Sequence, residues 1–210
     1  GANPANPAPG ANPNPRPPST GPAHDFAAVA EQVAANAPEA RDILVRHARE
    51  LQSLVDGFSG PAETFLTVLD GPASIDPTVL RQRVAAVQSL KDAGTRYTTA
   101  ARSLRERLEA DLRAEPRVDK DAVPSISGRF LAMSSATGRI FAIEQVIRAG
   151  DDLAQQSQLV LESPSSWSID ARGNVTTPDV SKAGEYRMYE TKLMGPKRML
   201  RSVVDRAVSP

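Results

Sequence analysis

Residues 76–115 read "DPTVLRQRVAAVQSLKDAGTRYTTAARSLRERLEADLRAE" and form the strongest structural pattern in the chain. Apolar side chains recur here every three or four residues, which is the repeat of one face of an α-helix. Asp76 and Pro77 suit the first positions of a helix, and Pro116 follows its end. The apolar positions are Leu80, Val84, Val87, Leu90, Ala93, Tyr97, Ala101, Leu104, Leu108 and Leu112. The stretch therefore predicts one helix about 60 Å long.

The middle of this helix contains weak helix formers. Gly94, Thr95, Thr98 and Thr99 lie within six positions, and glycine and β-branched residues lower helix propensity. We therefore allow for a kink or a break near Gly94. Between residues 102 and 113 arginines alternate with acidic residues, which indicates a solvated face rather than a stripe that binds nucleic acid.

Three shorter helical segments precede residue 76. Asp25 is a candidate cap for the first, and Pro38 suits the first turn of the second. The apolar residues of the second are Ile43, Leu44, Leu51, Leu54, Val55 and Phe58. We expect the second to stop at Gly57 or Gly60, and a separate short helix to follow over residues 61–71.

Two helical regions follow residue 116. Residues 125–161 predict a helical segment whose broad apolar face contains Ile126, Phe130, Met133, Ile140, Phe141, Ile143 and Ile147. Its small residues 134–138 favour a tight crossing with a neighbouring helix over the alternative, a ligand pocket beneath them. Residues 180–210 predict two amphipathic helices divided at Gly195-Pro196.

A β-hairpin is expected between these two regions. Trp167 and Ile169 alternate before a turn, and Val175 and Thr177 alternate after it. Asp170 and Gly173 occupy the first and fourth positions of a type I turn. Because a lone hairpin is marginally stable in water, its Trp167 face must pack on the helices or on a partner.

These patterns predict a mainly α fold, a bundle of four to six amphipathic helices that includes the long helix over about 76–115, with a small C-terminal β-hairpin and a disordered Pro-rich N-terminal tail. We place a spacer at 1–24, the helical bundle at 25–163, and the hairpin with the C-terminal helices at 164–210. That last part is expected to pack on the bundle or on a partner.

Composition excludes several classes of function. Lys+Arg and Asp+Glu both number 25, so the overall charge does not favour nucleic acid or an anionic membrane. Cysteine is absent from the sequence, which removes disulfides, thiolate metal sites and cysteine nucleophiles. No apolar run approaches the roughly 18 residues that span a bilayer, and we expect a soluble chain.

The chemistry-bearing residues form no recognised motif. His24 lies in the tail, and we interpret His47 as a residue of a polar helix face, because its spacing to Asp42 or Glu50 is not that of a zinc motif. No phosphate loop, nucleophile elbow or dinucleotide fingerprint occurs. Asp151 and Asp152 are adjacent acids, although Asp151 could instead cap a new helix. We expect no enzyme, no cofactor, no metal and no small-molecule substrate.

Residues 1–24 contain four Asn-Pro pairs, which resist both helix and strand. They predict an extended spacer of up to about 60 Å. A spacer of this composition before a folded domain resembles those of mature bacterial lipoproteins. The resemblance implies a lipid anchor that is absent from this chain and an extracytoplasmic location, periplasmic or at the surface. The alternative is a cytoplasmic or particle-associated protein.

Two hypotheses for function remain. The first is a non-enzymatic scaffold or protein-binding module, tethered to a surface like a lipoprotein. The second is a structural subunit of a larger assembly, such as a phage or viral particle or a secretion apparatus, which would dock or self-associate through its N-terminal arm and C-terminal helix. Met is an adaptable side chain at contact surfaces. The candidate partner-binding residues are Trp167, Tyr186, Met188, Tyr189, Met199, Leu200 and Val203.

Overall fold

The computed structural model describes residues 25–208, except for the side chains of 195–198, and is mainly helical. Its elements are α1 (Phe26–Ala34), the 3-10 helix η1 (Pro38–Ala40), α2 (Arg41–Asp70), α3 (Pro77–Ala114), α4 (Val123–Ser134), α5 (Ala136–Leu161), the 3-10 helix η2 (Pro164–Ser166), β1 (Ser168–Ile169), β2 (Val175–Thr176) and α6 (Val180–Val208). The prediction of a mainly helical chain with a small antiparallel hairpin is confirmed. The predicted N-terminal tail lies outside the described residues.

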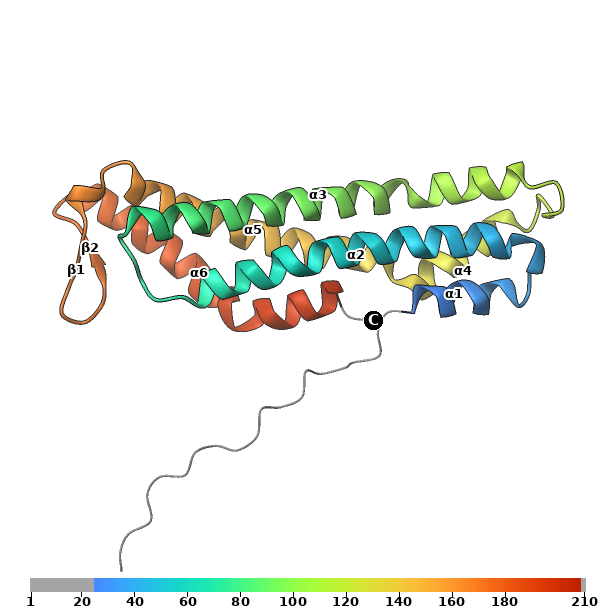
Figure 1. The fold of residues 1–210 in the computed structure, drawn as a ribbon, viewed down its shortest axis with the longest axis horizontal. Coiled ribbons are helices and arrows are strands. Elements are labelled where there is room, and N and C mark those ends of the chain that lie inside the picture. Colours follow the sequence, from blue (N-terminus) through green and yellow to red (C-terminus); the bar gives the residue numbers. More distant parts are fainter. Residues whose placement is uncertain (1–24, 209–210) are drawn as a thin grey trace, which may run out of the picture.

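The long helices lie side by side in an elongated bundle (Figure 1). α3 packs against both α2 and α5, and α6 lies along α5 and also contacts α2. The short helices α1 and α4 pack together at one end of the bundle, and the hairpin lies at the other end (Figure 1). One apolar core joins all six α-helices. The proposed division of the chain at residue 163 stays a prediction.

The predicted apolar face of α3 forms the centre of this core. Each residue of that face is buried, apart from Val84, which is half-buried. The helix begins where the sequence indicates, because the Asp76 carboxylate accepts a hydrogen bond of 2.7 Å from the backbone N–H of Thr78. Asp25 caps α1 in the same way, by accepting from the N–H of Ala28 at 2.9 Å. Local capping and periodicity are therefore sufficient to locate these two helix starts.

Gly94 does not break α3, because it lies at the contact with α5. A Cβ atom at this position would lie 2.6 Å from the Cδ1 atom of Ile147 and 3.0 Å from the Cγ2 atom of Ile143. The reverse contact occurs at Gly150 of α5, where a Cβ would lie 3.1 Å from a methyl group of Leu90. These two glycines let the backbones of α3 and α5 approach closely.

The segment 134–138, where the sequence predicts a tight crossing, contacts α3 at Ala136, whose carbonyl accepts from the Tyr97 hydroxyl at 3.3 Å, but makes no close contact at Gly138. A Cβ added to Gly138 would meet no atom within 4 Å. Ser135 instead has a left-handed backbone, with φ 51°, and it separates α4 from α5. The predicted segment 125–161 is therefore two helices, since a left-handed residue reverses the helical path.

Two predicted helix ends are also wrong, because the helices continue through their proline and glycine residues. α2 runs through Gly57, Gly60 and Pro61 without a break. Phe58, within this stretch, and Phe65, one turn after it, are fully buried, so packing outweighs the weak local propensity. The backbone of α6 is likewise helical through Gly195-Pro196, and the helix changes direction along its length (Figure 1).

The hairpin packs on the helices of its own chain. β1 and β2 pair antiparallel, with Ile169 opposite Val175. Gly173 has φ 81°, and its N–H donates to the Asp170 carbonyl at 2.9 Å, which closes the predicted turn. Trp167 is 5% exposed and packs with Leu80, Leu159, Val160 and Tyr186 in a second apolar cluster. Burial of Trp167 therefore anchors a hairpin that is too short to stand alone.

We predict that Gly94→Ala destabilises the fold relative to Gly57→Ala. Both changes remove the same helix-interior glycine penalty of about 1 kcal/mol. A Cβ at Gly57 meets open space, whereas one at Gly94 meets two isoleucines. The two variants should therefore differ by about 1–3 kcal/mol in the free energy of unfolding, the usual cost of overpacking. Urea titration monitored by circular dichroism measures this difference, and equal stabilities would contradict the assigned contact.

Candidate functional site

The seven candidate partner-binding residues lie in two separate places. Trp167, Tyr186 and Tyr189 lie near the hairpin end of the bundle, and Met199, Leu200 and Val203 lie further along α6. Trp167, Tyr186, Tyr189, Leu200 and Val203 are buried within the chain, between 2% and 8% exposed. Met188 is 43% exposed and Met199 is 62% exposed. The structure therefore does not bring the seven together, and their role in partner binding stays a prediction.

The aromatic candidates have partners inside the chain. The rings of Trp167 and Tyr186 lie 5.4 Å apart between centroids. The Tyr189 hydroxyl donates to Gln155 Oε1 of α5 at 2.6 Å, and Lys192 lies 5.3 Å from the Tyr189 ring. These contacts attach the first half of α6 to α5, so the buried aromatic groups already contribute to the fold.

Three of the candidates line a shallow groove between α5 and α6, which we call the α5–α6 groove. It has a volume of about 240 Å³ and is lined by Gln145, Arg148, Ala149, Met199, Leu200 and Val203. Leu200 and Val203 form its buried floor, whereas Met199 is exposed beside it. An open, mainly apolar groove between two helices is a shape that another helix can enter.

Phe141 extends this surface by one helical turn. Phe141, Gln145 and Arg148 are spaced by four and three residues, so they share one stripe of α5. Phe141 is 62% exposed, and its assignment to the buried face of segment 125–161 is wrong. The sequence contains a sign of this exposure. Ile140 and Phe141 are adjacent, and adjacent residues of a helix point about 100° apart, so the two side chains are not expected to lie on the same narrow buried face.

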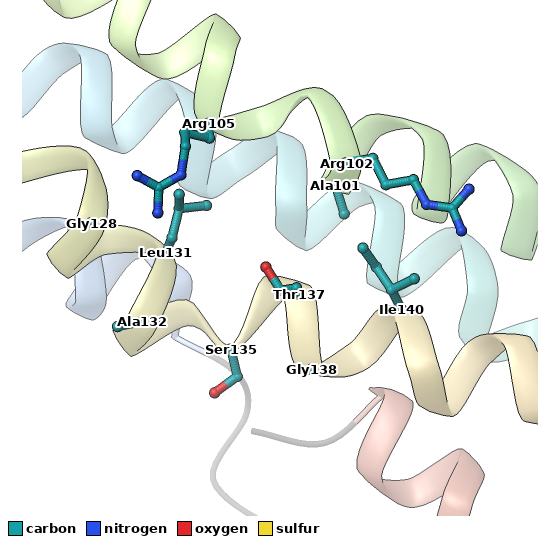
Figure 2. Close-up of a pocket in the computed structure, with 10 residues that line it drawn as sticks. All are labelled: Ala101, Arg102, Arg105, Gly128, Leu131, Ala132, Ser135, Thr137, Gly138 and Ile140. Carbon is teal, nitrogen blue, oxygen red and sulfur yellow. The ribbon is translucent and has the colours of Figure 1, made fainter. Parts of the chain in front are cut away.

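A larger hollow, of about 650 Å³, lies where α3 faces the junction of α4 and α5 (Figure 2). It occupies the region where the small residues 134–138 raised the alternative of a pocket. Figure 2 shows Arg105 reaching from α3 toward Leu131, with Ile140 below Ala101 and the Ser135 hydroxyl pointing away.

The cations of this hollow already have carboxylate partners. Arg102 donates to Glu144 at 2.5 Å, and Arg105 lies 3.6 Å from Glu109. Glu109 also accepts from the Ser127 hydroxyl at 3.0 Å, and this bond is the main cause of its lowered pKa. Glu109 is shared with Arg113, which lies 2.9 Å from it. Because Arg102 and Arg105 are both exposed to water and each already lies at a carboxylate, neither is a buried cation that lacks an anion.

His47 is buried, at 3% exposed, so its assignment to a polar helix face is wrong. Its Nε2 atom lies 2.8 Å from Oδ2 of Asp111 on α3, and Arg46 donates to the same oxygen at 2.8 Å. Beside them Arg107 donates to both carboxylate oxygens of Glu50, at 2.7 and 2.8 Å. These contacts join α2 to α3, which sequence spacing could not show because the partners are 64 and 57 residues apart.

The charges around His47 explain the ionisation of Asp111. Partial burial by itself would raise the pKa of this carboxyl, but the hydrogen bond from His47 and the charge of Arg46 outweigh burial. The net effect is a lowered pKa for Asp111. Asp111 therefore stays ionised in the fold and holds one α2 histidine and one α2 arginine.

Asp151 and Asp152, the adjacent acids of α5, pair with lysines on different helices. Asp151 accepts from Lys91 of α3 at 2.7 Å, and Asp152 lies 3.6 Å from Lys192 of α6. α5 continues through both residues, so the alternative that Asp151 caps a new helix is wrong. Their divergent partners make them interhelical contacts rather than a paired general acid and base.

Within residues 25–208 no group of three or more His, Asp or Glu side chains could hold a metal ion. None of the helices described here combines the length and apolarity that a membrane span requires. No protein family, curated protein or solved structure matches the chain.

Truncation of Leu200 should lower the free energy of unfolding far more than truncation of Met199. Leu200 is 2% exposed in the floor of the α5–α6 groove, whereas Met199 is 62% exposed. We expect Leu200→Ala to lower the free energy of unfolding by about 2–5 kcal/mol. Met199→Ala should change it by about 0.5 kcal/mol or less. Thermal and urea unfolding measure both changes, and a large loss for Met199→Ala would show that this side chain supports the fold.

The Asp111 carboxylate should make stability depend on pH. Its folded-state pKa is lowered from the ordinary value of 3.8, so it stabilises the fold above that value. This contribution is lost as the pH falls through the folded pKa. We expect Asp111→Asn to be less stable than the wild type at pH 7, with a gap that narrows below about pH 4. Asp205→Asn, at an exposed acid of α6, is the control. An identical pH profile for both variants would contradict this role.

Proposed function

We propose that this protein is a non-enzymatic helical module that binds a partner protein through the α5–α6 groove and the adjacent Phe141. The observation that carries the proposal is the exposure of two large apolar side chains, Phe141 and Met199, at 62% each. They lie beside a groove whose floor is apolar. Exposed apolar groups that gather at a groove are typical of contact surfaces.

The partner that fits this surface is an amphipathic helix with acidic residues beside its apolar face. The groove lies between two helices, and Met199 can adapt its shape to an apolar side chain. Arg148 lines the groove, is exposed, and forms no ion pair with a described residue; its Nε donates only to the Glu144 carbonyl, at 3.4 Å. A carboxylate on the partner would satisfy this cation and orient the bound helix.

The second candidate function is a structural subunit in which the same surface binds another copy of the chain. Met194, at 63% exposed, and Ile169, at 43%, favour it, because they are further exposed apolar side chains outside the groove. In either function residues 1–24 would act as a spacer, and a lipid-tethered, extracytoplasmic location remains part of the first proposal.

Site-specific photo-crosslinking tests the proposal. A photoreactive phenylalanine analogue replaces Phe141 or Met199 in the full chain, within the cells that make it. Arg96, exposed on α3, is the control position. We expect one protein to be crosslinked from 141 and 199 and not from 96. With that protein purified, Phe141→Glu or Met199→Glu should weaken binding at least about tenfold in calorimetry, as for a central interface residue. Arg96→Glu should leave binding unchanged.

Two other outcomes would overturn the first proposal. If positions 141 and 199 capture the same proteins as position 96, the groove is not a specific surface. If they capture only a second copy of this chain, and the purified protein sediments as an oligomer that Met199→Glu dissociates, the structural subunit takes its place.

A further inference from the structure

A smaller cavity, of about 310 Å³, lies among the end of α2, α3, α5 and the first half of α6. It shares no lining residue with the α5–α6 groove. The lining residues that bear on its chemistry are Leu69, Arg83, Gln156, Tyr186, Glu190 and Leu193. Four helices therefore contribute to one cavity, and α5 and α6 are far in sequence from α2 and α3.

Arg83 is the central polar group of this cavity. It is 7% exposed, and its Nη2 atom donates to the Pro72 carbonyl at 2.5 Å. No carboxylate in the described part of the chain forms an ion pair with it, whereas Arg41, Arg102 and Arg107 each hold a glutamate. Burial also lowers the pKa of the Arg83 guanidinium, and Tyr186 only partly offsets this effect. A buried cation without an anion is a costly arrangement, which a bound anion would relieve.

Two further polar groups line the same cavity with hydrogen-bonding capacity to spare. Gln156 is 7% exposed and Tyr186 is 8% exposed. Neither side chain hydrogen-bonds to another residue between 25 and 208. The amide and the phenol can both donate to an oxygen atom placed beside Arg83.

The remaining walls restrict the charge and the size of a ligand. Leu69 and Leu193 are each 6% exposed and present apolar surface. Glu190 contributes a carboxylate to the lining, and its charge raises the pKa of Tyr186 in addition to the larger effect of burial. The charge of Glu190 repels any anion, and it repels a doubly charged phosphate more than a singly charged carboxylate. The volume lies at the lower end of the range for ligand sites.

We propose that this cavity binds the carboxylate of a small ligand with an apolar body. The carboxylate accepts hydrogen bonds from Arg83, with Tyr186 and Gln156 as further donors, and the apolar body packs on Leu69 and Leu193. Such a group occurs in a short aliphatic acid and at the C-terminus of a peptide that ends in an apolar residue. The shared chemistry is a single carboxylate attached to a few apolar carbons.

The single tryptophan of the chain provides the readout for binding, because the Trp167 ring packs against the Tyr186 ring, with 5.4 Å between the centroids. We expect hexanoate to change the Trp167 fluorescence saturably in the purified full chain, and hexanol to have no effect. An acetylated tripeptide ending in leucine, compared with its C-terminal amide, tests the peptide source. The source that binds more tightly, hexanoate or the free tripeptide acid, identifies the natural class.

Variants of α3 separate binding from folding. Arg83→Met should weaken hexanoate binding at least tenfold and keep the fold, because an apolar residue of similar size often replaces a buried ion without loss of stability. Arg83→Lys, which keeps the charge, should bind better than Arg83→Met. Arg81→Met, at an exposed position two residues earlier, should bind like the wild type. If neither acid gives a saturable signal, if inorganic phosphate binds more tightly, or if Arg83→Met binds normally, the proposal is overturned.

Discussion

The close contact between α3 and α5 is the constraint on which the rest of the bundle depends. Gly94 of α3 lies beneath Ile143 and Ile147, and Gly150 of α5 lies beneath Leu90. Each glycine thus receives the apolar side chains of the opposite helix, so the two backbones come closer than side chains on both would allow. α3 also contacts α2, and α5 also contacts α6, so this pair connects the two sides of the core.

Charged residues border the apolar contacts between the helices. They affect which helices pair, and in what register, more than they add to the stability of the fold. Lys91 and Asp151, and Arg102 and Glu144, flank the α3–α5 contact on exposed surfaces, where ion pairs contribute little. His47 is different, because its ring is buried and its Asp111 partner is on another helix. Without the Asp111 carboxylate, the buried His47 ring would lose its hydrogen bond. The need for this bond therefore links the register of α2 to that of α3.

The two proposed binding regions lie on different parts of α6. Its first half contributes Tyr186, Glu190 and Leu193 to the Arg83 cavity, and its second half contributes Met199 and Val203 to the α5–α6 groove. The sequence places two of the three Tyr residues and three of the four Met residues of the chain between Tyr186 and Met199. Composition could not divide the residues by role, because burial depends on which neighbours face each side chain.

The sequence by itself determined the helical class, the start of α3 at Asp76, the buried face of that helix and the turn at Gly173, because each follows from periodicity or from the conformation of one or two residues. Only the tertiary structure decided that α2 continues through Pro61 and that Ser135 ends α4. The Arg83 cavity is the clearest case, since its lining residues range along the sequence from Leu69 to Met194 and only packing brings them together. Propensity and capping describe the conformation that a segment favours in isolation. Burial against distant segments determines where the chain adopts a different conformation.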